Sequence, residues 1–336
     1  MNICLRKYLF VALHLTLLAG CNDAGETLPL EENMPVVFSM EFGSKTRSTL
    51  DNVWPDNTQI AISKGSGNTL SYYTPANASS ANSGQAITLT ASGSNMLSWP
   101  SSDPHWVFSA WYPYSVTAPT GITVANDQGA IDDDTYYGYD IMYSPAVSDI
   151  YQATVPLKFY HQMSRVMVVV ITDNTPNKES VTSVTFGEGT KDISVSGTFT
   201  MGVTGGVAGT AASWTPTTAS NSYITMRKTS TSTEEDSHIF RYECMLPPQS
   251  GGSSDDILLT IMTTGYIDEN DETQTPQARK YVYKAAYDLQ AGYQTNYFIT
   301  CKDGSVIIII TSSVAGWNST IQNIGGNATV PDNRYN

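Results

Sequence analysis

The sequence predicts an all-β protein made of two β-sandwich domains. Short runs of β-branched and aromatic residues recur along the chain, and turn residues separate them. No long segment has the 3.6-residue periodicity of an amphipathic helix. The 336 residues are enough for two domains of ordinary size. Strands at this spacing, without intervening helices, favour sandwiches.

The composition is typical of an extracellular β-protein with many turns. Charged residues make up 14% of the chain, about half the usual share, and Thr, Ser, Asn and Gly are abundant instead. The formal net charge is −14 and no stretch is rich in Lys or Arg. Nucleic acid is therefore not an expected partner.

Residues 1–21 are typical of a lipoprotein signal peptide. Arg6 and Lys7 form a short basic region, and the apolar core over 9–19 is too short to cross a bilayer as a helix. The Leu-Ala-Gly-Cys sequence at 18–21 is similar to a bacterial lipobox, which implies cleavage before Cys21 and acylation of that cysteine. The alternative is an ordinary secretory signal cleaved nearby. In either case the protein leaves the cytoplasm, and in the first case acyl chains attach it to a membrane.

Residues 22–47 form a polar, acidic stretch followed by a strand candidate over 36–42. The side chains expected on its apolar face are Val36, Phe38, Met40 and Phe42. The loop that follows is expected to be solvated. An Arg-specific protease would therefore reach the bond between Arg47 and Ser48.

The first predicted domain covers 48–153. Its strand candidates are Ile60–Ser63, Ser71–Thr74, Ala86–Thr90 and Trp106–Tyr112. Five aromatic residues would suit stacking on a sugar, but at this density on a strand we expect them in the core: Trp99, Trp106, Trp111, Tyr112 and Tyr114. The tyrosine-rich segment 136–143 is expected to be exposed and is the better candidate for adhesive contacts.

The longest strand-like stretch, Val155–Ile171, opens the second predicted domain, 154–336. Apolar and polar residues alternate at its start, whereas both alternating sets are apolar from Val166 onward, as in a strand buried on both faces. The later strand candidates are Val181–Phe186, Ile193–Met201, Ile257–Thr263, Arg279–Lys284, Tyr297–Cys301 and Val306–Thr311. Cys244 and Cys301 either pair or remain buried thiols, and the sequence leaves both alternatives open.

No motif predicts catalysis. The four histidines lack metal-binding spacing, and the chain has no nucleophile elbow, P-loop or Cys-x-x-Cys. We therefore expect a non-enzymatic protein with no metal and no cofactor. His161 is expected to be a structural, hydrogen-bonded residue. The acidic run 268–272 is expected to be a solvated hairpin tip, with a calcium site as the weaker alternative.

Several stretches, taken in order, resemble one family. They are 18–21, 46–47, Trp54–Ile62, Phe108–Tyr114, Asp140–Ser144, Leu157–Val166, Leu289–Tyr297 and Gly316-Trp317. On these stretches the chain resembles the fimbrillins, the major and accessory pilins and related lipoproteins of Bacteroidetes pili. Each piece is short, and it is their order along the chain that makes the resemblance specific.

The resemblance implies two tandem transthyretin-like β-sandwich domains. It also implies a lipoprotein precursor in the outer membrane, cleavage by an Arg-specific surface protease, and a cell-surface fimbrium after maturation. By this resemblance residues 22–47 are a propiece, and cutting after Arg47 would detach it together with the strand at 36–42 and open a groove. A strand from another pilus subunit would then fill this groove by β-strand addition.

The C-terminal region 306–336 holds the expected donor strand, with Val306, Ile308 and Ile310 as its apolar residues. This run also suits a permanent core strand, and the tail beyond it carries apolar residues at irregular intervals. A tip or accessory subunit is therefore favoured over a stalk subunit, and a host or bacterial surface ligand is a further expected partner. The alternative function is a surface-anchored lipoprotein that binds a glycan or host protein without polymerising.

Overall fold

The computed structural model describes 34–42, 58–64, 69–75, 87–91, 96–99, 105–150, 154–172, 179–188, 193–200, 212–217, 223–236, 238–266, 277–302, 305–311 and 327–329. These residues form an all-β structure with sandwich-like sheets, which confirms the predicted class. The helices among them are two short ones, α2 (Asp133–Gly138) and α3 (Ser232–Asp236). None of the described helices has the length and apolar character needed to cross a membrane.

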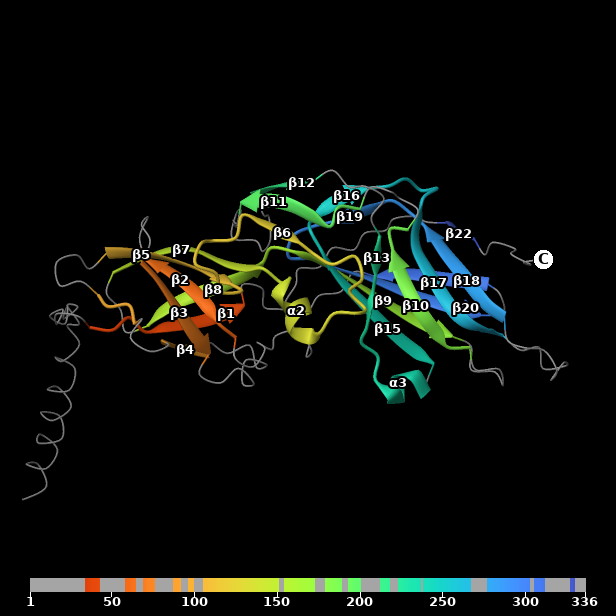
Figure 1. Ribbon diagram of the computed structural model, residues 1–336, viewed down its shortest axis with the longest axis horizontal. Coiled ribbons are helices and arrows are strands. Elements are labelled where there is room, and N and C mark those ends of the chain that lie inside the picture. The colour runs from red at the N-terminus through yellow and green to blue at the C-terminus, as the bar shows by residue number, and fades with distance from the viewer. Residues whose placement is uncertain are drawn as a thin grey trace, which may run out of the picture.

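The first sheet has seven strands and closes on itself in the order β1-β4-β3-β2-β5-β7-β8. The strands are β1 (Phe38–Phe42), β2 (Ile60–Lys64), β3 (Thr69–Pro75), β4 (Ile87–Ala91), β5 (His105–Tyr112), β7 (Met142–Ile150) and β8 (Val155–His161). All neighbouring strands are antiparallel except β1 and β8, which run parallel. This sheet lies on the left in Figure 1.

The first hydrophobic core lies inside this closed sheet. In β8 the alternation predicted from the sequence is observed, because Val155, Leu157 and Phe159 are buried and Lys158 is exposed. The core also includes Ile60, Ile62, Tyr73, Leu89, Leu97, Trp99, Phe108, Ala110 and Met142. Each strand thus contributes one face to a shared interior.

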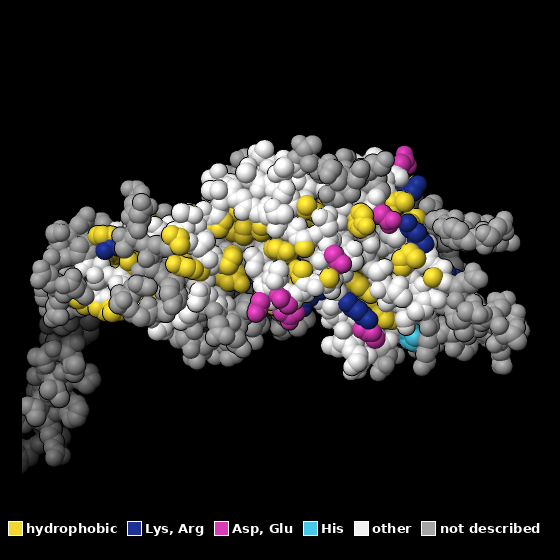
Figure 2. All heavy atoms as spheres, in the orientation of Figure 1, with side chains coloured by type: hydrophobic (Ala, Val, Ile, Leu, Met, Phe, Trp, Pro, Cys, Tyr) yellow, Lys and Arg dark blue, Asp and Glu magenta, His cyan; other side chains and the backbone are white. Residues whose placement is uncertain are grey.

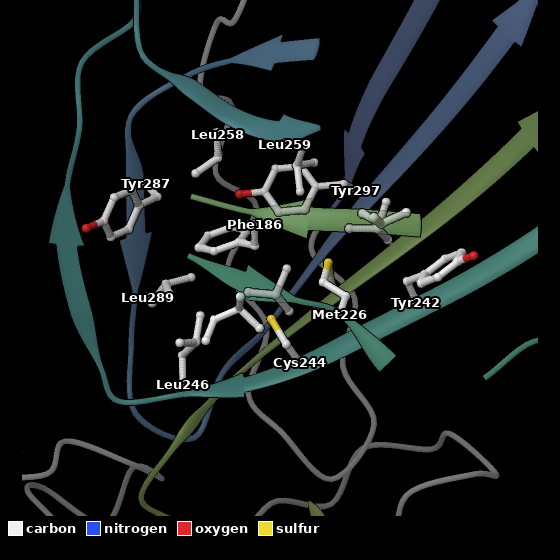
Figure 3. Close-up of a cluster of buried hydrophobic side chains, with 14 of the residues drawn as sticks. Phe186, Met226, Tyr242, Cys244, Leu246, Leu258, Leu259, Tyr287, Leu289 and Tyr297 are labelled. Atoms are coloured by element: carbon white, nitrogen blue, oxygen red, sulfur yellow. The ribbon is translucent and has the colours of Figure 1, made fainter. Parts of the chain in front are cut away.

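Two five-stranded sheets form the larger part of the molecule. One has the order β13-β10-β17-β18-β22 and the other β14-β15-β9-β20-β21. Their strands are β9 (Ser164–Thr172), β10 (Val181–Phe186), β13 (Ile224–Thr225), β14 (Arg227–Lys228), β15 (Ile239–Leu246), β17 (Ile257–Tyr266), β18 (Gln277–Lys284), β20 (Gln294–Lys302), β21 (Ser305–Thr311) and β22 (Asn327–Thr329). Figure 3 shows side chains of both sheets meeting in the second core, among them Phe186 and Leu259 on one side and Tyr242 and Tyr297 on the other.

Strand β9 is the middle strand of its sheet. It pairs antiparallel with β15 and parallel with β20 over eight residue pairs each. Val168 and Val170 face the second core and Val169 on the opposite face is also buried, whereas Ile171 is 40% exposed. Burial on both faces, as the sequence predicted, is therefore found only around Val169, because Arg165 and Met167 on the same face are partly exposed.

The chain changes sheet between β8 and β9, and only Gln162 and Met163 separate the two strands. The stretch 155–171, which looked like one long strand in the sequence, is thus two strands in two sheets. The predicted domain limits 48–153 and 154–336 stay a prediction.

Between β5 and β7 the chain leaves the first sheet and joins the second core. We call residues 113–141 the excursion. The strand β6 (Gly121–Thr123) of the excursion pairs with β11 (Ser196–Thr200), which pairs with β12 (Ala212–Pro216). A separate small sheet consists of β16 (Gln249–Gly251) and β19 (Tyr287–Leu289). Three buried side chains of the excursion belong to the second core: Val124, Tyr136 and Ile141. Figure 1 shows β6 and α2 between the first sheet and the larger ones.

Gln128 attaches the excursion to β15. Its side-chain Nε2 donates to the carbonyl of Met245 at 2.7 Å, and the Met245 N–H donates to Gln128 Oε1 at 2.9 Å. The Gln128 side chain is fully buried. Its amide therefore satisfies both main-chain groups of Met245, as a neighbouring strand would.

The predicted exposed tyrosine segment 136–143 is wrong at Tyr136, which is 1% exposed. Asp132 accepts a hydrogen bond from the Thr135 N–H at 2.7 Å and caps α2. The short helix docks Tyr136 into the second core, while Tyr137 remains 42% exposed. Figure 2 shows acidic side chains gathered beside α2 and hydrophobic side chains across the middle of this face.

Candidate functional site

Strand β1 fills the position between β4 and β8, which we call the β1 slot (Figure 1). On one side it pairs antiparallel with β4 from Phe38 opposite Leu89 to Met40 opposite Ile87. On the other side it pairs parallel with β8 over five residues, from Phe38 opposite Val155 onward. Both edges of β1 are therefore hydrogen-bonded, and the strand closes the sheet.

The residues before β1 extend this attachment. The Val36 N–H donates to the carbonyl of Leu97 at 2.8 Å, and the Trp99 N–H donates to the carbonyl of Met34 at 2.7 Å. The Val155 N–H donates to the carbonyl of Val37 at 2.8 Å. The segment 34–42 is thus held by main-chain hydrogen bonds along its length.

The side chains of this segment alternate between core and surface. Val36, Phe38 and Met40 are buried in the first core, whereas Val37 between them is 37% exposed. Phe42 is paired through its main chain with Phe159, and its side chain lies outside the described residues. The segment therefore supplies one apolar face to the sheet that it closes.

Phe38 lies at the centre of an aromatic cluster. Its ring meets the Tyr73 ring at 5.2 Å between centroids and the Phe108 ring at 5.1 Å, both edge to face. Tyr73 accepts a hydrogen bond from the Leu97 N–H at 2.9 Å, and burial raises the pKa of its hydroxyl. Edge-to-face pairs add about 0.5–1.5 kcal/mol each to the burial of the rings.

One ion pair lies on the outer face of the slot. Lys158 Nζ is 3.4 Å from Glu41 Oε1, and the two residues are opposite each other in the β1–β8 register. The Lys158 side chain is 54% exposed, so the pair contributes at most about 1 kcal/mol to stability. Lys158 thus places a positive charge opposite one position of the slot, the one that Glu41 takes.

The expected lipidation and cleavage residues, Cys21, Arg47 and Ser48, lie outside the described residues. The donor candidates Val306, Ile308 and Ile310 belong to β21, which pairs with β20 over seven residue pairs, and their side chains are not described. The structure therefore brings the predicted propiece strand into the first core and the predicted donor run into a sheet of the second.

Cys244 and Cys301 are free, buried thiols. They lie on opposite sides of β9, where Cys244 is opposite Val166 and Cys301 opposite Thr172. Six residues along a strand span roughly 20 Å, far beyond disulfide reach. Burial raises the pKa of Cys301 to about 12 and shifts the pKa of Cys244 upward as well.

Within the described ranges no cluster of three or more His, Cys, Asp or Glu side chains could hold a metal ion. His161 Nδ1 lies 2.7 Å from Asp140 Oδ1, and this partly buried contact joins the end of β8 to the end of the excursion. Trp99, Trp111 and Tyr112 are buried, as the core interpretation predicted, whereas Trp106 is only partly buried and Tyr114 is 36% exposed. The acidic run 268–272 lies outside the described residues.

A small cavity of about 210 Å³ lies beside β5 and β7. Its lining mixes aromatic rings and hydroxyl groups: Ser109, Trp111, Ala118, Pro119, Thr120, Tyr143, Phe199 and Thr200. The excursion forms one wall of the cavity and β11 another.

Sequence reasoning did not single out Tyr73, Phe108 or Lys158 as parts of the β1 slot. The signal in the sequence was indirect: β1 and β8 both carry an apolar residue at every second position. Matching two such patterns across more than a hundred residues requires the fold, because many strands of this chain alternate in the same way.

The family model described as fimbrillin-like matches residues 46–317 of the chain. A candidate cell adhesion protein from Bacteroides uniformis is 17% identical, with a TM-score of 0.52 and coverage of 84% of this chain and 98% of that one. A second, from Bacteroides ovatus, is 15% identical, with a TM-score of 0.53 and coverage of 83% and 96%. At this identity the two solved structures show the fold alone. No curated protein matches the chain.

Proposed function

Because the chain belongs to the fimbrillin-like family, we propose that it is a pilus subunit that accepts a strand from another subunit in the β1 slot. One observation carries the proposal: β1 closes the first sheet and is hydrogen-bonded on both edges. A strand held in this way is replaceable by another strand with the same alternation.

The proposed precursor is exported as a lipoprotein, acylated on Cys21, and held at the outer membrane. An Arg-specific surface protease then cuts between Arg47 and Ser48, five residues beyond the end of β1. Before the cut, β1 is tethered to its slot and has an effective concentration on the order of millimolar. After the cut this advantage is lost, and a strand of a neighbouring subunit competes on equal terms.

An empty β1 slot would be unstable. Val36, Phe38 and Met40 are almost fully buried, and burial of three such side chains is worth roughly 5–9 kcal/mol. This is comparable with the whole stability of many domains. The main-chain edges of β4 and β8 would also lose their partner. Cleavage therefore leads to strand replacement, and an empty groove does not persist.

We assign the chain to the tip or accessory positions of a fimbrium, with two transthyretin-like sandwiches. The donor candidate within 306–336 is β21, whose main chain already pairs with β20. An acceptor role is thus better supported than a donor role. The family membership also favours a non-enzymatic protein.

A second candidate function is a surface-anchored lipoprotein that binds a glycan or a host protein without polymerising. The cavity beside β5 and β7 favours it, because aromatic rings next to hydroxyl groups suit a sugar. Binding to a glycan array that is lost on Tyr143→Ala, with Tyr137→Ala as the exposed control, would support this alternative.

The test uses the full chain and an Arg-specific protease. We expect a new N-terminus at Ser48, and binding of a labelled peptide with the sequence of residues 34–42 only after the cut. Arg47→Ala should remain uncut and bind no peptide, whereas the matched control Lys45→Ala should behave like the wild type. A chain that is cut at Arg47 and never takes up the peptide contradicts the proposal.

A further inference from the structure

We infer that the β1 slot selects its strand by chemistry: an aromatic residue at the Phe38 position, apolar residues at the Val36 and Met40 positions, and a carboxylate opposite Lys158. The inference rests on the proposed strand-acceptor function and names the partner of that same site. The partner is an extended segment of a different chain that runs parallel to β8.

The aromatic requirement follows from the contacts of Phe38. Its fully buried ring presents edge-to-face contacts to two fixed neighbours, Tyr73 and Phe108. Phe108 is itself held against Trp99 at 5.6 Å between centroids. An aliphatic residue would fill part of the volume but would lose both ring contacts, which predicts a loss of affinity on the order of 10- to 100-fold.

The register follows from alternation and charge together. Phe38 and Met40 lie opposite Val155 and Leu157, which are both buried, so a slip by one residue would turn the apolar side chains of the incoming strand to the solvent. In the correct register, one residue of the incoming strand lies opposite Lys158 and takes the place that Glu41 has in β1. A carboxylate there is favoured a few-fold over a neutral side chain, and a cation is disfavoured.

Strand β21 of a second copy does not meet these requirements. Its sequence Ser-Val-Ile-Ile-Ile-Ile-Thr has no aromatic residue on either face and no acidic residue at any position. Its main chain is also paired with β20 over seven residue pairs, and these hydrogen bonds would have to break before β21 could leave. β21 is therefore a poor donor to the slot of a second copy, and the slot fits a strand from a different protein.

The experiment measures the affinity of labelled peptides for the full chain after cleavage at Arg47. The reference peptide has the sequence of residues 34–42, and two variants of it carry Phe38→Ile or Glu41→Lys. A fourth peptide has the sequence of residues 305–311. The protein is used as the wild type and as Lys158→Glu, a substitution at an exposed side chain that the first core does not need.

We expect the Phe38→Ile peptide to bind 10- to 100-fold more weakly than the reference, and the 305–311 peptide to bind more weakly still. The Glu41→Lys peptide should lose a few-fold in affinity for the wild type and regain it on Lys158→Glu. Equal affinity of the reference and 305–311 peptides would overturn the inference and leave the strand-acceptor function standing. If no peptide binds the cleaved chain, the proposed function itself fails.

Discussion

Replacing Gln128 by Met tests whether the excursion is an integral part of the second core. Met has nearly the same length and shape as Gln but has no amide. The substitution would leave the Met245 N–H and carbonyl without the two hydrogen bonds that Gln128 provides at 2.9 and 2.7 Å. Both groups are buried there, and each unsatisfied group costs about 1–3 kcal/mol. We therefore expect the free energy of unfolding to fall by about 2–6 kcal/mol.

Urea unfolding followed by tryptophan fluorescence measures this loss, since the free energy scales with the midpoint at constant slope. The matched control is Ala130→Met, which introduces the same residue two positions away on the exposed surface and should change the free energy by less than about 0.5 kcal/mol. If Gln128→Met unfolds like the wild type, the excursion does not stabilise β15, and the reasoning is refuted.

Three further outcomes are expected. Phe38→Ala should destabilise the uncut precursor by about 3–5 kcal/mol in urea unfolding, whereas Val37→Ala on the exposed face should have little effect; equal effects would contradict the placement of β1. The thiols of Cys244 and Cys301 should resist a thiol reagent at pH 8 until the chain is unfolded, and rapid reaction of the folded protein would exclude their burial. Burial raises the pKa of Tyr281 to about 12. Its neutral form is thus favoured in the folded state, and stability should be lost as pH rises from about 10 toward 12; unchanged stability by alkaline titration would refute this.

Many of the strands could be predicted because their signal is local, although β7 and β15 were not among the predicted strands. In β8 the alternation of Leu157 and Phe159 with Lys158 is written in consecutive residues, and the structure buries and exposes them accordingly. In β9 the apolar residues on both faces indicated a strand covered on both sides. Val169 is buried as expected, but Met167 on the same face is only partly buried and Ile171 is exposed. The single long stretch divided into two strands because the chain changes sheet at Gln162 and Met163, which no local pattern indicates.

The partners of the strands could not be predicted in the same way. Phe38 pairs with Val155, and nothing in the seven residues of the propiece strand specifies that partner. The burial of Tyr136 was missed for the same reason, because the acidic residues before it indicate an exposed turn, and the core that covers the ring comes from strands far along the chain. The N-cap of α2 depends on neighbouring residues, Asp132 and Thr135, whereas the surface against which the helix packs depends on the tertiary fold.

The two-residue link between β8 and β9 determines how the molecule transmits tension. A pull along a strand in the β1 slot acts on its hydrogen bonds with β8 in shear, so that the five residue pairs resist together and do not open one at a time. The force then passes through Gln162 and Met163 into β9. This strand is paired with β15 on one side and β20 on the other, over eight residue pairs each. The covalent link between β8 and β9 thus carries the force from the slot to the middle strand of a second-core sheet. Along this path, extension requires paired strands to slide past one another.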